Sequence, residues 1–147
     1  MIGRLNVDLS FHGILVQLPL PKHINSQRIL RSIIPDKDVD GFHPENAGLL
    51  SLGEPRYIPC TPKGIMRILD YYDIDLKGKN VVVVGRSNIV GRPISILTSL
   101  KMNGANGTTT ICHSGTSDIA HHTRSADFVI VALGVPGFLD QDMLKEG

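Results

Sequence analysis

The sequence is short of the features that mark membrane-bound, nucleic-acid-binding and disulfide-rich proteins. No apolar run reaches the roughly 18 residues that a membrane-spanning helix needs. Asp8, His12 and Gln17 interrupt the partly apolar N-terminus, so it has no signal-peptide core. Lysine and arginine number 15 against 14 acidic residues, without the basic excess of non-specific nucleic-acid binders. Two cysteines, Cys60 and Cys112, cannot build a disulfide framework. We therefore expect a reduced, cytoplasmic, water-soluble protein that binds neither membrane nor nucleic acid.

What is present is enough for a folded protein. Hydrophobic residues make up 41% of the 147 residues and charged residues 20%, which excludes wholesale disorder. A chain of this length can bury roughly 68–70% of its unfolded surface. It corresponds to one domain, or to one domain plus part of another.

The strongest pattern lies in the second half of the chain. Val81–Val84 is a continuous β-branched run, which suits a strand buried on both faces of a parallel sheet. Strand, helix, strand, helix and strand are expected in turn at 81–84, 92–101, 108–112, 118–126 and 128–133. This order predicts an α/β fold with a Rossmann-like half, in which helices flank a parallel sheet.

The first half has a related rhythm. Gly13–Leu18 is expected to be a strand, halted by the prolines after it. Ser26–Ile34 is expected to be a helix that ends before Pro35, and a shorter helix is expected near Ala47–Leu52. We place two lobes at 1–57 and 58–147.

A helix over residues 61–73 is expected to link the two lobes. Thr61 is a good N-cap, and proline at the next position suits the first helical turn. The apolar residues of this segment fall on one helical face: Ile65, Ile68, Leu69 and Tyr72.

A glycine loop follows the Val81–Val84 run. Gly85 and Gly91 lie where a strand turns into a helix, and glycine there lets backbone amides approach a pyrophosphate. Ser87 occupies the second glycine position of the dinucleotide-binding pattern, and the spacing does not fit a Walker loop. The loop alone is compatible with dinucleotide binding or with a tight turn that holds no ligand.

The end of the second strand favours NADP over NAD. NAD-binding folds usually place an acidic residue there to hold the ribose 2′-hydroxyl, but this strand runs into Cys112–Thr116 without one. Arg86 in the glycine loop could pair with a 2′-phosphate. The alternatives are a solvated cation for Arg86 and an ordinary turn residue for Ser114.

The first half offers two further polar candidates. Gln17 is the one polar residue of its predicted strand and lies near the carboxyl end, where α/β sheets bind ligands. The aspartates at 36, 38 and 40 would point the same way if the chain were extended. They match the start of a calcium loop, but Ala47 stands where that loop needs glutamate, so we reject calcium. The histidines and cysteines lack metal-ligand spacing, so no metal site is predicted.

Six segments in one order carry a resemblance to a known family. They are HGILVQLPLP (12–21), PDKDVDGFHPENAG (35–48), PCTPKG (59–64), VVVVGRSNIVGRP (81–93), TTTICHS (108–114) and the stretch 132–137. Together they resemble the bifunctional methylenetetrahydrofolate dehydrogenase/methenyltetrahydrofolate cyclohydrolase family of the bacterial FolD type. The resemblance covers nearly the whole chain.

The resemblance implies an activity and its residues. The family oxidises 5,10-methylenetetrahydrofolate with NADP and hydrolyses the methenyl product to 10-formyltetrahydrofolate, and its members are generally homodimers. By resemblance Gln17 and Asp40 are catalytic, and they bind the folate together with Pro19. The cofactor-binding residues implied by the resemblance are Gly85, Arg86, Ser87, Gly91 and Ser114.

Two departures from the family qualify this reading. Members carry a catalytic tyrosine and lysine before the region that matches Gly13, but only 12 residues precede it here and none is Tyr or Lys. Members also continue beyond the point that matches Gly147. We therefore expect an enzyme fragment that is inactive by itself. The alternatives are a non-catalytic NADP-binding module and another two-lobed NADP dehydrogenase.

Overall fold

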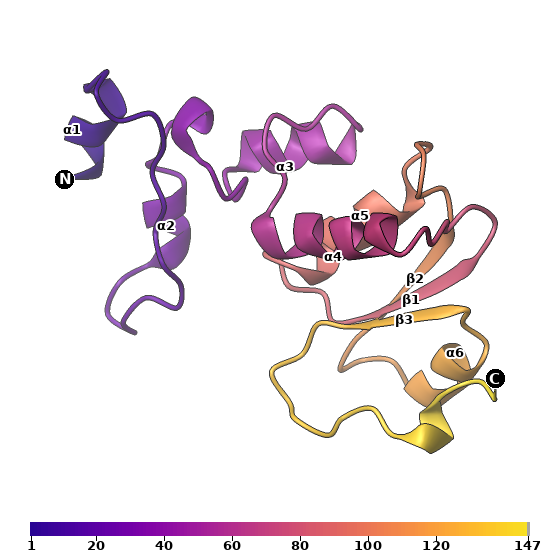
Figure 1. Ribbon diagram of the computed structural model, residues 1–147. Coiled ribbons are helices and arrows are strands. Elements are labelled where there is room, and N and C mark those ends of the chain that lie inside the picture. Colours follow the sequence, from indigo (N-terminus) through magenta and orange to yellow (C-terminus); the bar gives the residue numbers. More distant parts are fainter. Residues whose placement is uncertain (147) are drawn as a thin grey trace. The chain divides into compact units, whose positions relative to one another are not determined.

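The computed structural model describes residues 1–146 of the chain. It divides into two compact units, Met1–Cys60 and Thr61–Gly147, and the boundary between them lies inside helix α4 (Cys60–Tyr71). Figure 1 shows the elements of both units. The lobe limits placed at 57 and 58 remain a prediction. No helix in the described part of the chain is long and apolar enough to cross a membrane.

The unit Thr61–Gly147 is built on a three-stranded parallel sheet, as predicted. Its order is β2-β1-β3, with β1 in the centre. The predicted strands are confirmed in place, the third being shorter than expected. The elements are β1 (Asn80–Val84), α5 (Gly91–Ser99), β2 (Thr108–Cys112), α6 (Ile119–Arg124), β3 (Phe128–Val131) and the 3-10 turn η2 (Gln141–Met143).

The central strand is the core of this unit. Side chains alternate along a strand, and Val81 to Val84 are all nearly or fully buried, at 0–4% exposure, because helices cover both faces. Figure 1 shows α5 and α6 on opposite sides of the sheet. Val82 and Val84 pack with Cys112 and Ala126 in one cluster. A hydroxyl pair, Thr98 Oγ1 to Thr109 Oγ1 at 2.9 Å, also joins α5 to β2.

The unit Met1–Cys60 consists mainly of short helices and loops. Its elements are α1 (Ile2–Val7), α2 (Ser26–Leu30), the 3-10 turn η1 (Pro35–Lys37) and α3 (Pro44–Ser51). The short helix expected near 47–52 is thus confirmed, beginning three residues earlier because Pro44 starts it and His43 Nδ1 caps it by accepting the Glu45 N–H.

The predicted strand at Gly13–Leu18 was wrong. The segment forms one isolated parallel bridge, between Ile14 and Asp38. The Ile14 N–H donates to the Lys37 carbonyl at 2.7 Å, and Ile14 is buried while Leu15 is 59% exposed. An extended apolar run becomes a strand only where a second segment lies alongside it, and the 3-10 turn before Asp38 limits that pairing to a single residue.

Helix α2 also ends four residues before the predicted Ile34. The Asn6 side chain intervenes, since its amide donates to the Ser32 carbonyl at 2.7 Å and its oxygen accepts the Ile34 N–H at 3.2 Å. The Ser32 hydroxyl in turn donates to the Ile29 carbonyl at 2.6 Å. These bonds satisfy backbone groups that a longer helix would use, so the chain leaves the helix early.

Helix α4 differs from its prediction at both ends and on its surface. It begins at Cys60, so Thr61 is part of the first turn and not its N-cap, and it ends at Tyr71. The predicted apolar face is not a buried one in this structure. Ile68 and Tyr72 are 59% and 67% exposed.

Burial makes a quantitative prediction for two isoleucines of this unit. Ile94, on α5, is fully buried, whereas Ile68, on α4, is 59% exposed. Ile94→Ala should lower the free energy of unfolding by about 2–5 kcal/mol, because it removes packed methylenes and leaves a cavity. Ile68→Ala is the matched control and should change it by less than about 0.5 kcal/mol. Urea unfolding followed by circular dichroism measures both, and equal losses would contradict the described core.

Candidate functional site

The carboxyl end of β1 turns sharply at Gly85. This residue has φ +124°, and a Cβ atom there would lie 2.4 Å from the Ala132 carbonyl oxygen. The Gly85 N–H donates to the Cys112 carbonyl at 2.8 Å. The backbone of β1 is therefore packed directly against the ends of both neighbouring strands, and only glycine fits.

The start of α5 is packed just as closely on this turn. A Cβ on Gly91 would lie 2.3 Å from the Gly85 carbonyl oxygen. The Ser87 hydroxyl accepts the N–H groups of Val90 and Gly91 at 3.2 and 3.3 Å, and its carbonyl accepts the Arg92 N–H at 3.0 Å. Ser87 thus orders the first turn of the helix. Its place in the glycine pattern did not reveal this function.

Two exposed side chains lie at the same edge of the sheet. Arg86 follows β1 and Ser114 follows β2, and these strands are parallel neighbours, so their carboxyl ends meet at one edge. Among the described residues, neither side chain makes a hydrogen bond or ion pair. Two hydrogen bonds shape the turn that carries Ser114: the His113 N–H donates to the Thr116 hydroxyl, and the Thr116 N–H donates to the His113 carbonyl.

This edge fits a dinucleotide with a 2′-phosphate. Close packing at the two glycines brings the start of α5, the positive end of its dipole, to this edge of the sheet. Arg86 offers a guanidinium and Ser114 a hydroxyl, and neither needs to leave a partner to bind phosphate oxygens. Parallel sheets of this kind bind ligands at the carboxyl ends of their strands, and the strand order here reverses beside β1.

The acidic segment of the other unit does not point one way, which corrects the extended arrangement considered from the sequence. Because residues 35–37 form a 3-10 turn, neighbouring side chains diverge. Asp36 is exposed and pairs with Arg56. Asp38 is 1% exposed, and its carboxylate accepts the His43 N–H and the Asn46 amide, both at 2.8 Å.

Asp40 is left without such partners. It is half-buried, and no hydrogen bond or ion pair joins its carboxylate to another residue in the described part of the chain. Burial raises its pKa above 3.8, and the nearby negative charge of Asp38 raises the pKa further. An unpaired, perturbed carboxyl of this kind is the most site-like group of the unit Met1–Cys60.

Gln17 and Pro19 lie on the surface of that unit. Gln17 is exposed, not half-buried as a strand position would have made it, and its amide donates to the Leu18 carbonyl at 3.0 Å. Pro19 is exposed and follows a cis peptide bond. No described hydrogen bond joins Gln17 to Asp40. The structure thus leaves the joint function expected for these residues untested.

Two residues that sequence reasoning missed support Asp38. Asn46 is fully buried and Arg56 contacts three side chains of the acidic segment and α3. Asparagine inside a short helix was the available signal, since it is a poor helix former. The contacts themselves join residues 8 to 20 positions apart, which no local pattern encodes.

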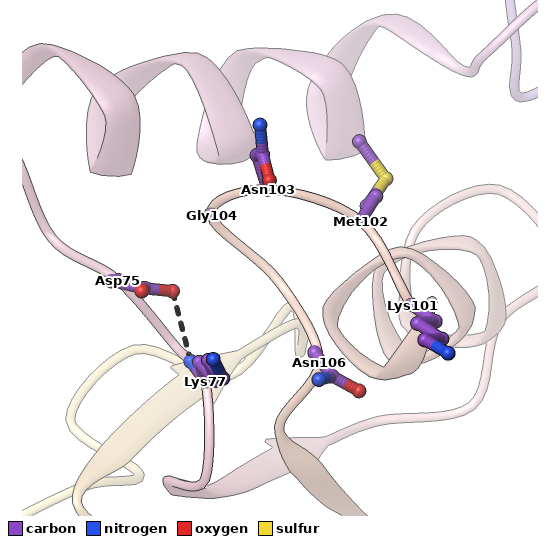
Figure 2. A pocket seen from close by; sticks show the side chains of 7 residues that line it. All are labelled: Asp75, Lys77, Lys101, Met102, Asn103, Gly104 and Asn106. Atoms are coloured by element: carbon purple, nitrogen blue, oxygen red, sulfur yellow. Dashed lines mark hydrogen bonds between the residues drawn. The ribbon is translucent and has the colours of Figure 1, made fainter.

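The segment Lys101–Gly107 is a surface loop, as predicted, and lines a hollow of about 440 Å³ (Figure 2). The hollow lies at the amino ends of β1 and β2, the edge opposite Gly85. Its lining residues are Asp75, Lys77, Lys101, Met102, Asn103, Gly104 and Asn106. None is a buried polar group directed into it. Within residues 1–146, no three His, Cys, Asp or Glu side chains gather as metal ligands.

The turn at Gly85 gives a steric prediction. Gly85→Ala should cost at least about 1–3 kcal/mol of stability, because alanine disfavours this φ and its methyl meets the Ala132 carbonyl. Gly134→Ala is the matched control, since open space surrounds that glycine, and it should stay within about 0.5 kcal/mol of the parent. Urea unfolding compares the two, and equal stability would refute the close approach.

Asp40 gives a pH prediction. Because its folded pKa is raised, the folded chain holds this proton more tightly than the unfolded chain, and stability falls as pH rises from 3.8 through the folded pKa. Asp40→Asn lacks this loss, so it should be more stable than the parent at pH 7 and gain progressively less toward pH 3.8. Unfolding curves at several pH values test this, and an Asn variant less stable at pH 7 would contradict it.

Known proteins match this chain along its length. A model of the tetrahydrofolate dehydrogenase/cyclohydrolase NAD(P)-binding domain matches residues 59–147, and one of the catalytic domain matches residues 1–40. Bifunctional protein FolD of Syntrophobacter fumaroxidans is 56% identical over 147 residues, which are 100% of this chain and 50% of that protein. Its counterpart in Haloquadratum walsbyi is 53% identical over 99% of this chain and 47% of its own.

Solved structures of FolD enzymes have the same fold as this chain. The bifunctional FolD enzyme of Campylobacter jejuni superposes with a TM-score of 0.93 at 52% identity, over 99% of this chain and 51% of that one. The Trypanosoma brucei FolD, described as complexed with NADP cofactor and inhibitor, superposes with a TM-score of 0.90 at 39% identity, over 99% and 49%. The chain spans about half the length of the relatives it matches. The chain belongs to the tetrahydrofolate dehydrogenase/cyclohydrolase family.

Proposed function

We propose that this chain is part of an NADP-dependent enzyme of folate one-carbon metabolism. The enzyme oxidises 5,10-methylenetetrahydrofolate to 5,10-methenyltetrahydrofolate and hydrolyses that product to 10-formyltetrahydrofolate. In this proposal 58–147 binds the cofactor and 1–57 contributes to the folate site. The observation that carries it is the carboxyl edge of β1 and β2, where a turn that only glycine can form adjoins two uncommitted side chains.

Each residue of that edge has a physical function in the proposal. Gly85 and Gly91 let the pyrophosphate lie against the backbone at the start of α5. Ser87 keeps that first turn ordered through its bonds to two N–H groups. Arg86 and Ser114 hold the 2′-phosphate, which selects NADP over NAD. When bound, the nicotinamide supplies the hydride acceptor, and the protein supplies orientation and electrostatics.

The folate residues are Gln17, Pro19 and Asp40. A carboxylate without a protein partner can accept two hydrogen bonds from the amino-pyrimidine edge of a pterin, and Asp40 is such a group. Gln17 offers an exposed amide, which by family resemblance bonds the catalytic lysine. That lysine is the base for hydrolysis in the family, and none of the first 12 residues of this sequence is a lysine.

The remaining parts of the proposal concern the complete enzyme. It is a cytoplasmic homodimer whose 10-formyl product supplies purine biosynthesis. Support comes from membership of the family and from the resemblance of the site segments. The 147 residues by themselves should bind NADP without catalysing either reaction.

Cofactor titration tests the site. Arg86→Ala should weaken NADP binding about 10–100-fold, the loss expected for one charge-assisted hydrogen bond to phosphate, and leave NAD binding nearly unchanged. Arg67→Ala is the matched control, since that arginine lies exposed on α4 and pairs with Asp70. Isothermal titration calorimetry measures the affinities of the parent, Arg86→Ala and Arg67→Ala chains for both cofactors. A folded parent chain that binds no NADP would contradict the proposal.

An activity assay separates the fragment from a self-sufficient enzyme. The purified chain should form no NADPH from 5,10-methylenetetrahydrofolate, because the family's catalytic lysine is not among its residues. Absorbance at the NADPH band measures this, with a full-length relative as the positive control. Sustained turnover by the chain alone would show that other residues provide the chemistry.

A further inference from the structure

The turn that carries Asp40 is held from inside by Asp38. The buried Asp38 carboxylate accepts the His43 N–H at 2.8 Å, and its backbone carbonyl accepts the Gly41 N–H at 3.0 Å. Both bonds span Asp40, because Asp40 lies in the sequence between the acceptor Asp38 and the donors Gly41 and His43. Gly41 allows the closure, since its φ is +69° and a Cβ would lie 3.0 Å from the Tyr57 carbonyl. The conformation at Asp40 therefore depends on a neighbouring carboxylate that is itself buried.

Asn46 in turn holds the Asp38 carboxylate. Its amide nitrogen donates to Asp38 at 2.8 Å and to the Pro35 carbonyl at 2.9 Å, and its oxygen accepts from Arg56 at 3.0 Å. Both amide hydrogens and the oxygen are thus in use, so the side chain has one orientation. A buried carboxylate needs such donors, because an unpaired charge away from water is costly.

Arg56 completes the chain of bonds. Besides Asn46 it binds Asp36 through Nε at 3.1 Å and Glu45 through Nη1 at 3.1 Å. It therefore joins the start of the acidic segment to the start of α3. A planar guanidinium with donors in fixed directions on separate nitrogens suits this, whereas a lysine ammonium offers its donors from a single nitrogen.

The other charged groups around the turn are also committed. The Lys37 ammonium is nearly buried and donates to the carbonyls of Leu5 and Asp8, both at 2.7 Å. His43 Nδ1 accepts the Glu45 N–H. Neither Lys37 nor Arg56 reaches Asp40 in the described structure. The arrangement satisfies every charge of the segment except the one that the proposed function assigns to the substrate.

We propose that Asp38, Asn46 and Arg56 are positioning residues, which act as one hydrogen-bonded support that presents Asp40 to the folate with its carboxylate unoccupied. The inference rests on the proposed function for the identity of the ligand. The support itself can be tested without any ligand. Asp40 then depends on side chains that do not touch the substrate.

The test is a carbon-13 NMR titration of the Asp40 carboxyl in the full 147-residue chain. In the parent, its pKa lies above 3.8. Asn46→Leu removes the amide while roughly keeping the volume. It should loosen the turn, admit water and bring the Asp40 pKa back toward 3.8. Hydrogen exchange at the Gly41 and His43 amides should accelerate at least about tenfold, as expected when a bond to a charged group is lost.

Two further variants decide the result. Glu45→Gln is the matched control, because it alters one Arg56 contact and leaves the Asp38–Asn46–Arg56 chain intact, so the Asp40 pKa and the two exchange rates should not change. If Asn46→Leu does not fold, Arg56→Lys keeps the charge, loses the fixed donors and should show the same changes, only smaller. A folded Asn46→Leu or Arg56→Lys chain with an unchanged Asp40 pKa and unchanged exchange would overturn the inference.

Failure of the inference and failure of the proposed function are distinguishable. Tetrahydrofolate is then titrated into the parent and the variants. Weakening of at least about tenfold in Asn46→Leu, with unchanged NADP affinity, is expected if the support serves the folate site. A parent that binds no tetrahydrofolate, together with the expected NMR changes, would refute the folate assignment and leave the support standing. Intact tetrahydrofolate affinity in a loosened turn would refute the inference alone.

Discussion

The cofactor half of this chain depends on one backbone contact, the close approach of Gly85 to Ala132 on one side and to Gly91 on the other. Because no side chain separates the end of β1 from the start of α5, the helix begins directly at the edge of the sheet. The same contact leaves the following residues, Arg86 and Ser87, at that edge, one exposed and the other ordering the helix. Steric fit, rather than a specific side-chain bond, thus creates the place where a phosphate can bind.

The main feature of the first half is the Asp40 carboxylate, which is half-buried and has no hydrogen-bond or ion-pair partner among the described residues. Asp40 carries a raised pKa, a sign that its charged form is less stable there than in water. The bonds among Asp38, Asn46 and Arg56 satisfy the charges beside Asp40, whereas among the described residues no such bond reaches Asp40 itself. The unit therefore gives up some stability at the one residue proposed to bind substrate, as is common at functional sites.

Local patterns predicted the second half well and the first half poorly, for a physical reason. The run Val81–Val84 is a continuous β-branched segment, which is typical of a strand buried on both faces, so its sequence is sufficient to predict the strand. Gly13–Leu18 is also largely apolar, but its one bridge joins Ile14 to Asp38, and a strand needs a continuous partner. Asn6 shortened α2 from 26 positions away, and Asn46 with Arg56 formed contacts that no periodicity encodes. Candidate residues could be named from motifs, whereas their supporting bonds required the folded chain.

The central claim is that NADP binds at the Gly85 turn, and amide chemical-shift mapping tests it most directly. A titration of the nitrogen-15-labelled chain with NADP should give saturable shifts at residues 85–91 and at Ser114, with residues 101–107 unaffected because they lie at the opposite edge of the sheet. Saturable shifts centred on 101–107, or no shifts at all in a folded sample, would contradict the account.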